Sequence, residues 1–321
     1  MNARLSFVHA LSPLHAGTGQ GVGIIDLPTA REKATGLPFL PGSSLKGALR
    51  ARCGNEAKTS QDKDECSKVF GPEPSNIDSN ENQASAVQFS DQRLLLLPIR
   101  SLAGTFAWVT SPYILRRLVR DMEDIEMTSP AGIPSIQEGN CLIVSKRNNQ
   151  EVDSKITVNA NKTQAVYLED LDLVPQPDDN ATDWAIWIAS RVFPDDDNAD
   201  WQTMLIERFC IVHDDIFSFL INTATEITAR IRMEENTKTV QEGALWYEEA
   251  LPTETILSGL VVATPVQKST LSAEKVFEIL QGLTTQTLQL GGNATVGRGM
   301  CRVQMTKEEK SNANQEPANK G

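Results

Sequence analysis

Short segments in which apolar and polar residues alternate recur along the chain, and each of them predicts a strand. The predicted strands cover residues 4–11, 87–97, 104–110, 141–144, 165–168, 226–233 and 255–263, with a last strand from residue 300. Four consecutive leucines at 94–97 predict a central strand that is buried on both faces. Apolar residues three or four positions apart predict helices between the strands. The predicted helices cover residues 111–122, 184–192, 201–209, 214–222 and 272–282, and one more follows residue 42.

Strands and helices in mixed order, separated by long polar stretches, predict an α+β fold. Residues 54–85 are poor in large apolar side chains and predict a surface insertion, and 123–200 holds further inserted elements. The charged, aromatic-bearing segment 234–252 predicts a protruding hairpin. We therefore expect a single domain over residues 1–306 and a disordered tail at 307–321.

The segment 15–52 contains the candidate chemistry. It begins with a glycine-rich arm, in which Gly17 and Gly19 belong to a run of glycines at every second position. Glycine lets a backbone approach a ligand closely. The arm leads to one carboxylate, Asp26, and then to a helix whose free N–H groups suit a phosphate. A solvated loop followed by an ordinary capped helix explains the same spacing equally well.

The helix after residue 42 adds positive charge to this segment. Ser43 or Ser44 is expected to cap it, and Lys46 and Arg50 share one face because they lie four residues apart. That face suits an RNA backbone, although exposed basic faces are also common without a ligand. The pattern predicts that the arm and helix hold RNA, with Asp26 beside a phosphate.

The net charge of −12 argues against an RNA-binding protein, because Lys and Arg supply most affinity for phosphates. The charge is segregated, however. Residues 1–53 contain six basic and two acidic residues, whereas residues 169–201 contain ten acidic residues and Arg191 alone. An acidic surface around a locally basic groove is compatible with RNA and disfavours non-specific RNA binding. The alternative is that the acidic residues only keep the protein soluble.

The cysteines and the hydropathy pattern indicate a cytoplasmic protein that does not enter a membrane. No apolar run approaches the ~20 residues of a membrane span, and the N-terminus does not resemble a signal peptide. The cysteines are five in number and widely spaced, without a CxxC pair. They are Cys53, Cys66, Cys141, Cys210 and Cys301. This pattern predicts reduced thiols and no zinc ribbon.

Known catalytic motifs are mostly excluded. The three histidines form no HExxH zinc motif, and the GSSLKG run lacks the spacing of a phosphate-binding ATPase loop. What remains is Asp26, with His15 eleven residues before it and Lys46 twenty after it. An ordinary aspartate is a poor base at neutral pH. Asp26 is therefore better suited to hold a metal ion beside RNA whose own 2′-hydroxyl attacks the phosphate. The alternative is an aspartate that only satisfies its loop.

Several motifs occur in an order typical of one family. They are HAGTG (15–19), GIIDLP (23–28), LPGSSLKGALR (40–50), FSDQRLLLLP (89–98), WVTSP (108–112), GALWYEE with LP (243–252) and GGNATVGRG (291–299). Together they resemble the RAMP superfamily, and within it the fourth, repeated backbone subunit of type III-B CRISPR Cmr complexes. The resemblance extends from about residue 5 to residue 303.

This resemblance implies a ferredoxin-like, RRM-type palm with insertions and a protruding β-hairpin thumb. It implies a metal-dependent endoribonuclease, with Mg²⁺ or Mn²⁺, that acts within an assembled complex and cuts target RNA at regular intervals. The implied partners are CRISPR RNA, single-stranded target RNA, further copies of the chain in a helical filament and other Cmr subunits. Three alternatives stay open: a non-catalytic guide-binding scaffold, a metal-independent guide-processing nuclease that works through His15, and an acidic interaction module that binds no RNA.

The resemblance also assigns residues. Asp26 falls on the catalytic, metal-positioning aspartate, His15 on a supporting position, and Glu248 or Glu249, with Tyr247, near the same site. The sequence does not decide between the two glutamates. The implied RNA-binding residues are Gly17, Gly19, Ser43, Ser44, Lys46, Arg50, Gly291, Gly292, Thr295, Gly297 and Arg298.

Overall fold

The structure is a computed structural model. It describes residues 2–17, 25–71, 84–145, 153–160, 163–234, 240–264 and 271–307. Gly19 and the predicted tail beyond residue 307 lie outside these ranges, as does part of the predicted insertion at 54–85.

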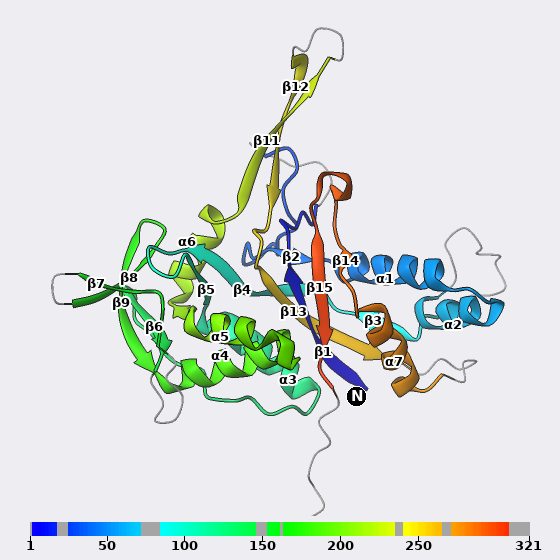
Figure 1. The fold of residues 1–321 in the computed structure, drawn as a ribbon, viewed down its shortest axis with the longest axis horizontal. Coiled ribbons are helices and arrows are strands. Elements are labelled where there is room, and N and C mark those ends of the chain that lie inside the picture. Colours follow the sequence, from blue (N-terminus) through cyan, green and yellow to red (C-terminus); the bar gives the residue numbers. More distant parts are fainter. Residues whose placement is uncertain are drawn as a thin grey trace, which may run out of the picture.

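A βαββαβ unit forms the palm (Figure 1). Its elements are β1 (Ala3–Ala10), α1 (Gly42–Glu56), β4 (Gln92–Arg100), β13 (Ile256–Ala263), α7 (Ala273–Leu283) and β15 (Met300–Met305). The strands lie in the order β15-β1-β13-β4, and each neighbouring pair is antiparallel. This is the ferredoxin-like arrangement. The predicted α+β palm is therefore confirmed, and the leucines at 94–97 are buried in β4 as expected.

Further strands extend the palm on both sides into one mixed sheet. Beyond β4 follow β5 (Phe106–Thr110), β10 (Phe209–Val212), β6 (Asn140–Val144), β9 (Leu171–Asp178), β8 (Thr163–Leu168) and β7 (Thr157–Ala160). Three short strands complete it, namely β2 (Phe39–Leu40) on β4, β3 (Val87–Phe89) on β13 and β14 (Leu288–Gln289) on β15. The predicted strand at 87–97 is thus interrupted at Ser90 and Asp91, and both parts pair antiparallel with β13.

Helices cover both faces of the palm. Besides α1 and α7 they are α2 (Ser60–Phe70), α3 (Pro112–Asp124), α4 (Asp179–Val192), α5 (Ala199–Glu207) and α6 (Asp214–Thr223), with 3-10 turns at Asp196–Asn198 and Ala294–Val296. Side chains of β1 alternate between the faces. Arg4 lies over the Phe277 ring of α7, whereas Phe7 packs on Trp187 of α4. None of the helices in the described ranges is long and apolar enough to cross a membrane.

A two-stranded hairpin projects from the palm (Figure 1). It pairs β11 (Glu226–Met233) with β12 (Val240–Ala250) in antiparallel register. The thumb-like segment was predicted at 234–252. The hairpin begins earlier, at Glu226, because the predicted strand 226–233 is its first arm.

The prediction that all cysteines are reduced is wrong for two of them. Cys53 at the end of α1 and Cys66 in α2 form a disulfide, with Cα atoms 5.9 Å apart. The segment predicted as a surface insertion contains α2, whose first turn is stabilised by a capping box between Thr59 and Asp62. This helix folds back on α1 and brings together two cysteines that are 13 residues apart. Cys141, Cys210 and Cys301 are free and buried.

Candidate functional site

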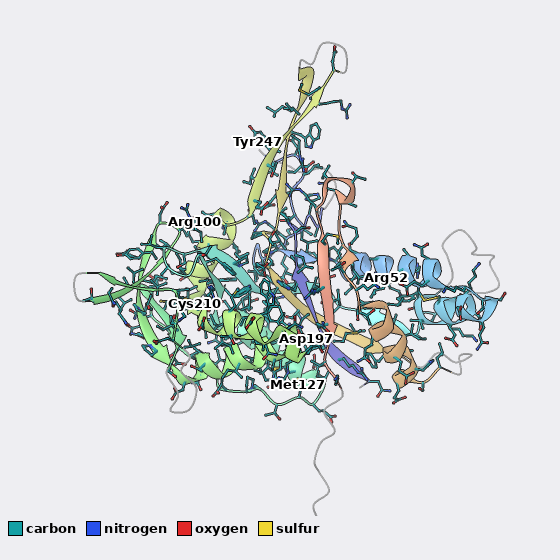
Figure 2. The ribbon with its side chains drawn as sticks, viewed as in Figure 1. Arg52, Arg100, Met127, Asp197, Cys210 and Tyr247 are labelled. Atoms are coloured by element: carbon teal, nitrogen blue, oxygen red, sulfur yellow. A yellow bond between two sulfur atoms is a disulfide. The ribbon has the colours of Figure 1, made fainter. Side chains whose placement is uncertain are left out.

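Asp26 lies at the base of the hairpin. The segment after residue 24 runs parallel to β12, with the Leu27 N–H donating to the Tyr247 carbonyl at 3.1 Å and the Glu249 N–H donating to the Leu27 carbonyl at 2.9 Å. Tyr247 is on the hairpin (Figure 2), and its N–H donates to Asp26 Oδ2 at 2.8 Å. Asp26 is exposed, and its Oδ1 makes no hydrogen bond to the described residues. One carboxylate oxygen is therefore fixed, while the other is available to a ligand.

Glu249 anchors this segment to the hairpin. Its buried carboxylate accepts hydrogen bonds from the Thr29 N–H and hydroxyl, both at 2.9 Å, and from Arg31 at 2.5 Å. Burial alone would raise the pKa of Glu249, but the hydrogen bonds from Arg31 and the Thr29 N–H and the Arg31 charge outweigh it and lower the pKa. Glu249 is thus an ionised group with its oxygens already occupied, which suits an anchor better than a proton acceptor.

Glu248 points away from Glu249 and connects the hairpin to the turn at 291–299. It accepts hydrogen bonds from Trp246 Nε1 at 2.9 Å, Asn293 Nδ2 at 3.0 Å and Arg230 Nε at 3.2 Å. Burial raises its pKa, but the hydrogen bonds from Trp246 and Arg230 and the charges of Arg230 and Arg298 lower it further than burial raises it. Glu248 therefore holds the glycine-rich turn against the hairpin.

His15 is held beside the same strand. Its Nδ1 lies 2.6 Å from the Glu249 carbonyl, which can only accept, so Nδ1 carries the proton and Nε2 has the free lone pair. Glycines surround the ring: a Cβ atom at Gly17 would lie 2.7 Å from Nε2, and the Gly292 N–H donates to the His15 carbonyl at 2.9 Å. The predicted glycine positions on the two loops therefore meet around His15.

Arg298 joins the 291–299 turn to β11. It is 6% exposed, and its NH2 donates to the Thr228 hydroxyl at 2.9 Å. Its NH1 is buried and has no hydrogen-bond partner among the described residues. Thr295 and Gly297 are exposed on the outer side of the turn, where they are accessible to a ligand. RNA binding by these three residues stays a prediction.

The basic face of α1 lies elsewhere. Lys46 donates to the Ser85 hydroxyl at 2.8 Å and to the Val87 carbonyl at 3.3 Å, and Arg50 donates to the Phe70 carbonyl. Burial, and then the Arg50 charge, lowers the pKa of Lys46. The two side chains share a face as predicted, but this face is turned toward the connection between α2 and β3. Arg52, further along α1, lies well apart from Tyr247 (Figure 2).

The predicted serine cap of α1 is wrong. The helix begins at Gly42 after Pro41 and has no side-chain cap from Ser43 or Ser44. The Asp91 carboxylate instead accepts the Gly42 N–H at 2.9 Å. The Ser44 N–H is already bonded to the Pro41 carbonyl at 2.9 Å. Fewer N–H groups are free for a phosphate than the sequence suggested, and RNA binding at Ser43, Ser44, Lys46 and Arg50 stays a prediction.

Sequence analysis missed the residues that hold the site together. They are Thr29, Arg31, Thr228, Arg230, Trp246 and Asn293. The alternation in 226–233 was the one available signal, because it places Thr228 and Arg230 on the same face of β11.

The geometry around Asp26 is better suited to binding a hydrated divalent ion than to using Asp26 as the only proton acceptor. Mg²⁺ usually keeps several waters and takes one or two carboxylates together with substrate phosphates. Asp26 offers one carboxylate oxygen that bonds none of the described residues, whereas both glutamates are occupied by protein donors. The donor set therefore fits Mg²⁺ or Mn²⁺ held mainly by water and a phosphate.

The lowered pKa values of Glu248 and Glu249 predict an acid-sensitive hairpin base. Both values lie below the ordinary 4.5, so the ionised carboxylates stabilise the fold above pH 4.5, and this contribution is lost as the pH falls through the lowered values. We expect the free energy of unfolding in urea to fall from about pH 5 downward. The Glu248→Gln, Glu249→Gln variant should show a flatter profile, and an equally steep one would contradict the assignment.

Replacing Gly291 by alanine should disturb the turn at His15. Gly291 has a φ of +72°, and an added Cβ would lie 2.3 Å from the His15 carbonyl oxygen. Gly297 is a matched control, because its φ is +80° and nothing lies within 4 Å. Both substitutions cost about 1–2 kcal/mol for the left-handed backbone, and Gly291→Ala should cost about 1–3 kcal/mol more for the clash. Urea unfolding measures the difference, and equal losses would refute the close packing.

Comparison with known proteins identifies relatives over nearly the whole chain. A model of the RAMP superfamily matches residues 7–302. The CRISPR system Cmr endoribonuclease Cmr4 of Pyrococcus furiosus is 35% identical over 303 residues, which are 94% of this chain and 95% of that protein. The structure of oligomeric Cmr4 from Pyrococcus furiosus superposes with a TM-score of 0.71 at 27% identity, covering 95% of this chain and 98% of that one.

A third comparison bears on the fold alone. A chain of the type III-B Cmr-β complex bound to cognate target RNA has a TM-score of 0.68 at 24% identity. It covers 94% of this chain and 96% of that chain. This chain therefore has the same overall fold as that chain.

Proposed function

Because this chain belongs to the RAMP superfamily, and within it to the Cmr4 subunits of type III-B complexes, we propose that it is an RNA-guided endoribonuclease. It binds CRISPR RNA as a repeated backbone subunit and cuts complementary target RNA at regular intervals. The observation that carries this proposal is Asp26 at the hairpin base, with Oδ2 fixed by the Tyr247 N–H and Oδ1 without a hydrogen bond to the residues that the structure describes. The family relationship supports the endoribonuclease activity, and the geometry of the site supports Asp26 as the residue that positions the metal ion.

The cut is an attack by the RNA's own 2′-hydroxyl oxygen on the adjacent phosphorus. The new bond gives a 2′,3′-cyclic phosphate, and the bond to the 5′-oxygen breaks. The 2′-hydroxyl proton passes to solvent water, and the 5′-oxygen takes a proton from water and leaves as a hydroxyl. A divalent ion held at Asp26 would supply positive charge to the phosphate oxygens. Asp26 positions the ion and the strand, and the Nε2 lone pair of His15 supports the site as a hydrogen-bond acceptor. Holding the reacting atoms in line would also contribute to the rate.

The surrounding residues fix the parts that would contact RNA. Glu249 and Arg31 fix the segment that carries Asp26, and Glu248 with Asn293 holds the exposed 291–299 turn to the hairpin. These surfaces would contact the ribose–phosphate chain, while base pairing with the guide reads the sequence. Thr295, Gly297 and the glycine arm contact the backbone in this proposal. Further copies of the chain in a filament and the other Cmr subunits complete the assembly, which acts in the cytoplasm.

Cleavage by the assembled complex with and without metal tests this proposal. The complex is incubated with RNA complementary to its guide, in Mg²⁺ or after treatment with EDTA. We expect regularly spaced cuts that require the metal and disappear in EDTA, while target binding persists. A target with one 2′-deoxy nucleotide should lose only the cut at that position. Equal cutting in EDTA would contradict the metal-assisted mechanism, and binding without any cutting would identify a guide-binding scaffold instead.

A further inference from the structure

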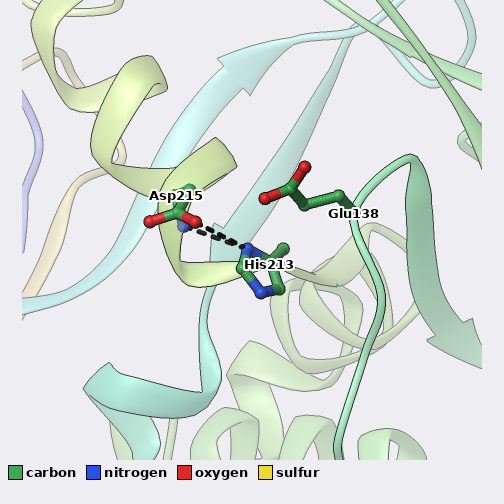
Figure 3. A group of neighbouring side chains, drawn as sticks. All are labelled: Glu138, His213 and Asp215. Carbon is green, nitrogen blue, oxygen red and sulfur yellow. Dashed lines mark hydrogen bonds and ion pairs between the residues drawn. The ribbon is translucent and has the colours of Figure 1, made fainter.

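Three metal-ligating side chains converge at a place that the proposed reaction does not use. Glu138 lies in the segment between α3 and β6, and His213 and Asp215 lie where β10 passes into α6 (Figure 3). Each offers one ligand atom, and these atoms all lie within 4.8 Å of one another. Two separate segments of the chain thus supply one imidazole and two carboxylates.

The contacts of His213 indicate that a cation fits here. The Asp215 N–H donates to His213 Nδ1 at 3.3 Å, so Nδ1 presents a lone pair rather than a proton. The same Nδ1 lies 3.5 Å from Asp215 Oδ2. Nδ1 and the carboxylate oxygen therefore face each other as two acceptors. A cation between them would take the Nδ1 lone pair and replace the hydrogen bond from the Asp215 N–H, which is long at 3.3 Å.

The spacing matches a small transition-metal ion. Two ligands at about 2.1 Å from a tetrahedral ion are about 3.4 Å apart, close to the 3.5 Å between His213 Nδ1 and Asp215 Oδ2. Glu138 is exposed, and its ligand oxygen already lies within 4.8 Å of the other two ligand atoms. Asp214 adds negative charge nearby, and the Arg116 guanidinium lies 3.9 Å from Asp214, not on the three ligands.

We propose that Glu138, His213 and Asp215 form a structural site for a divalent transition-metal ion of the Zn²⁺ type. Imidazole nitrogen favours such an ion over Mg²⁺, and water completes the coordination. The ion would tie the segment before β6 to the start of α6. That helix ends at Thr223, three residues before β11 begins, so the tether stabilises the root of the hairpin. The site goes beyond the proposed function, because it shares no residue with the Asp26 groove.

Calorimetric titration of the metal-stripped full-length protein with Zn²⁺ tests this proposal. We expect the chain to bind one equivalent of Zn²⁺ with high affinity, and His213→Ala to bind none. In Glu138→Gln the affinity for Zn²⁺ should fall by at least ~10-fold, which is the typical cost of losing even a residue that only supports a metal ligand. Glu123→Gln, an exposed acid on α3, is the matched control and should bind as the unmodified chain does. Circular dichroism confirms that each variant is folded.

A second readout separates this site from the catalytic one. Co²⁺ in place of Zn²⁺ should give visible absorption bands that are lost in His213→Ala and kept in Asp26→Asn. The proposal is wrong if the unmodified chain binds no Zn²⁺, or if His213→Ala and Glu138→Gln bind it unchanged. Loss of the ion in Asp26→Asn alone would assign it to the hairpin base and would also refute the proposal.

Discussion

Asp26→Asn should abolish target cleavage while leaving guide binding and assembly intact. The asparagine amide oxygen can still accept the Tyr247 N–H that now bonds Asp26 Oδ2, so the loop keeps its position. The neutral amide no longer attracts a divalent ion. We expect the cleavage rate to fall by about 10²–10⁴-fold, the range typical of losing a positioned catalytic group. Single-turnover cleavage of complementary RNA by the assembled complex measures this loss.

The control for Asp26→Asn is Asp170→Asn, which removes the same charge from an exposed carboxylate on the far insertion. This variant should cut at the normal rate. Regular cutting by Asp26→Asn would refute the catalytic assignment. Loss of target binding in that variant would instead show that Asp26 maintains the groove.

The second large effect concerns the anchor between Arg31 and Glu249. Arg31→Met leaves the Glu249 carboxylate, which is 3% exposed, without its countercharge at 2.5 Å. Breaking a buried pair in this way costs about 3–5 kcal/mol. We expect this loss in the free energy of unfolding, together with weaker cleavage, because the segment that carries Asp26 is held less firmly to β12 without the Arg31 contact. Urea unfolding of the purified chain measures the change.

A double-mutant cycle isolates the pair. Glu249→Gln removes the charge that Arg31→Met leaves unpaired, so the double variant should lose less than the sum of the single losses, by about 0.5–3 kcal/mol. Lys33→Ala, an exposed cation two residues away, is the control and should change stability by no more than about 0.5 kcal/mol. If the losses of the two single variants simply added up in the double variant, Arg31 and Glu249 would not stabilise each other.

The strands of the palm were predictable because each is encoded by a local pattern of apolar and polar residues. The alternating and all-apolar segments correspond to β1, β4 and β13, and the motif order indicated how they connect. The hairpin was only partly predictable. Its first arm alternates, yet Ile227, Ile231 and Leu245 are 50–55% exposed on one face of it. Alternation identifies the faces of a strand, but it does not say which face is covered.

The site was predictable only where a residue type is distinctive. Asp26 and His15 stood out as a lone carboxylate and a rare imidazole on glycine-rich segments. Their supports did not, because the pair formed by Arg31 and Glu249 spans 218 residues, and no local spacing encodes such a contact. Likewise, the spacing of Lys46 and Arg50 predicted a common face correctly, but its direction depends on where α2 and β3 pack.

The position of the scissile phosphate tests the central claim most directly. A structure of the assembled complex with target RNA that is 2′-deoxy at the cut nucleotide would trap the uncut strand. We predict that this phosphate lies beside Asp26 Oδ1, within the reach of one bridging metal ion or water, and between the hairpin and the 291–299 turn. A phosphate track that follows Lys46 and Arg50 on α1 and bypasses the hairpin base would contradict the account.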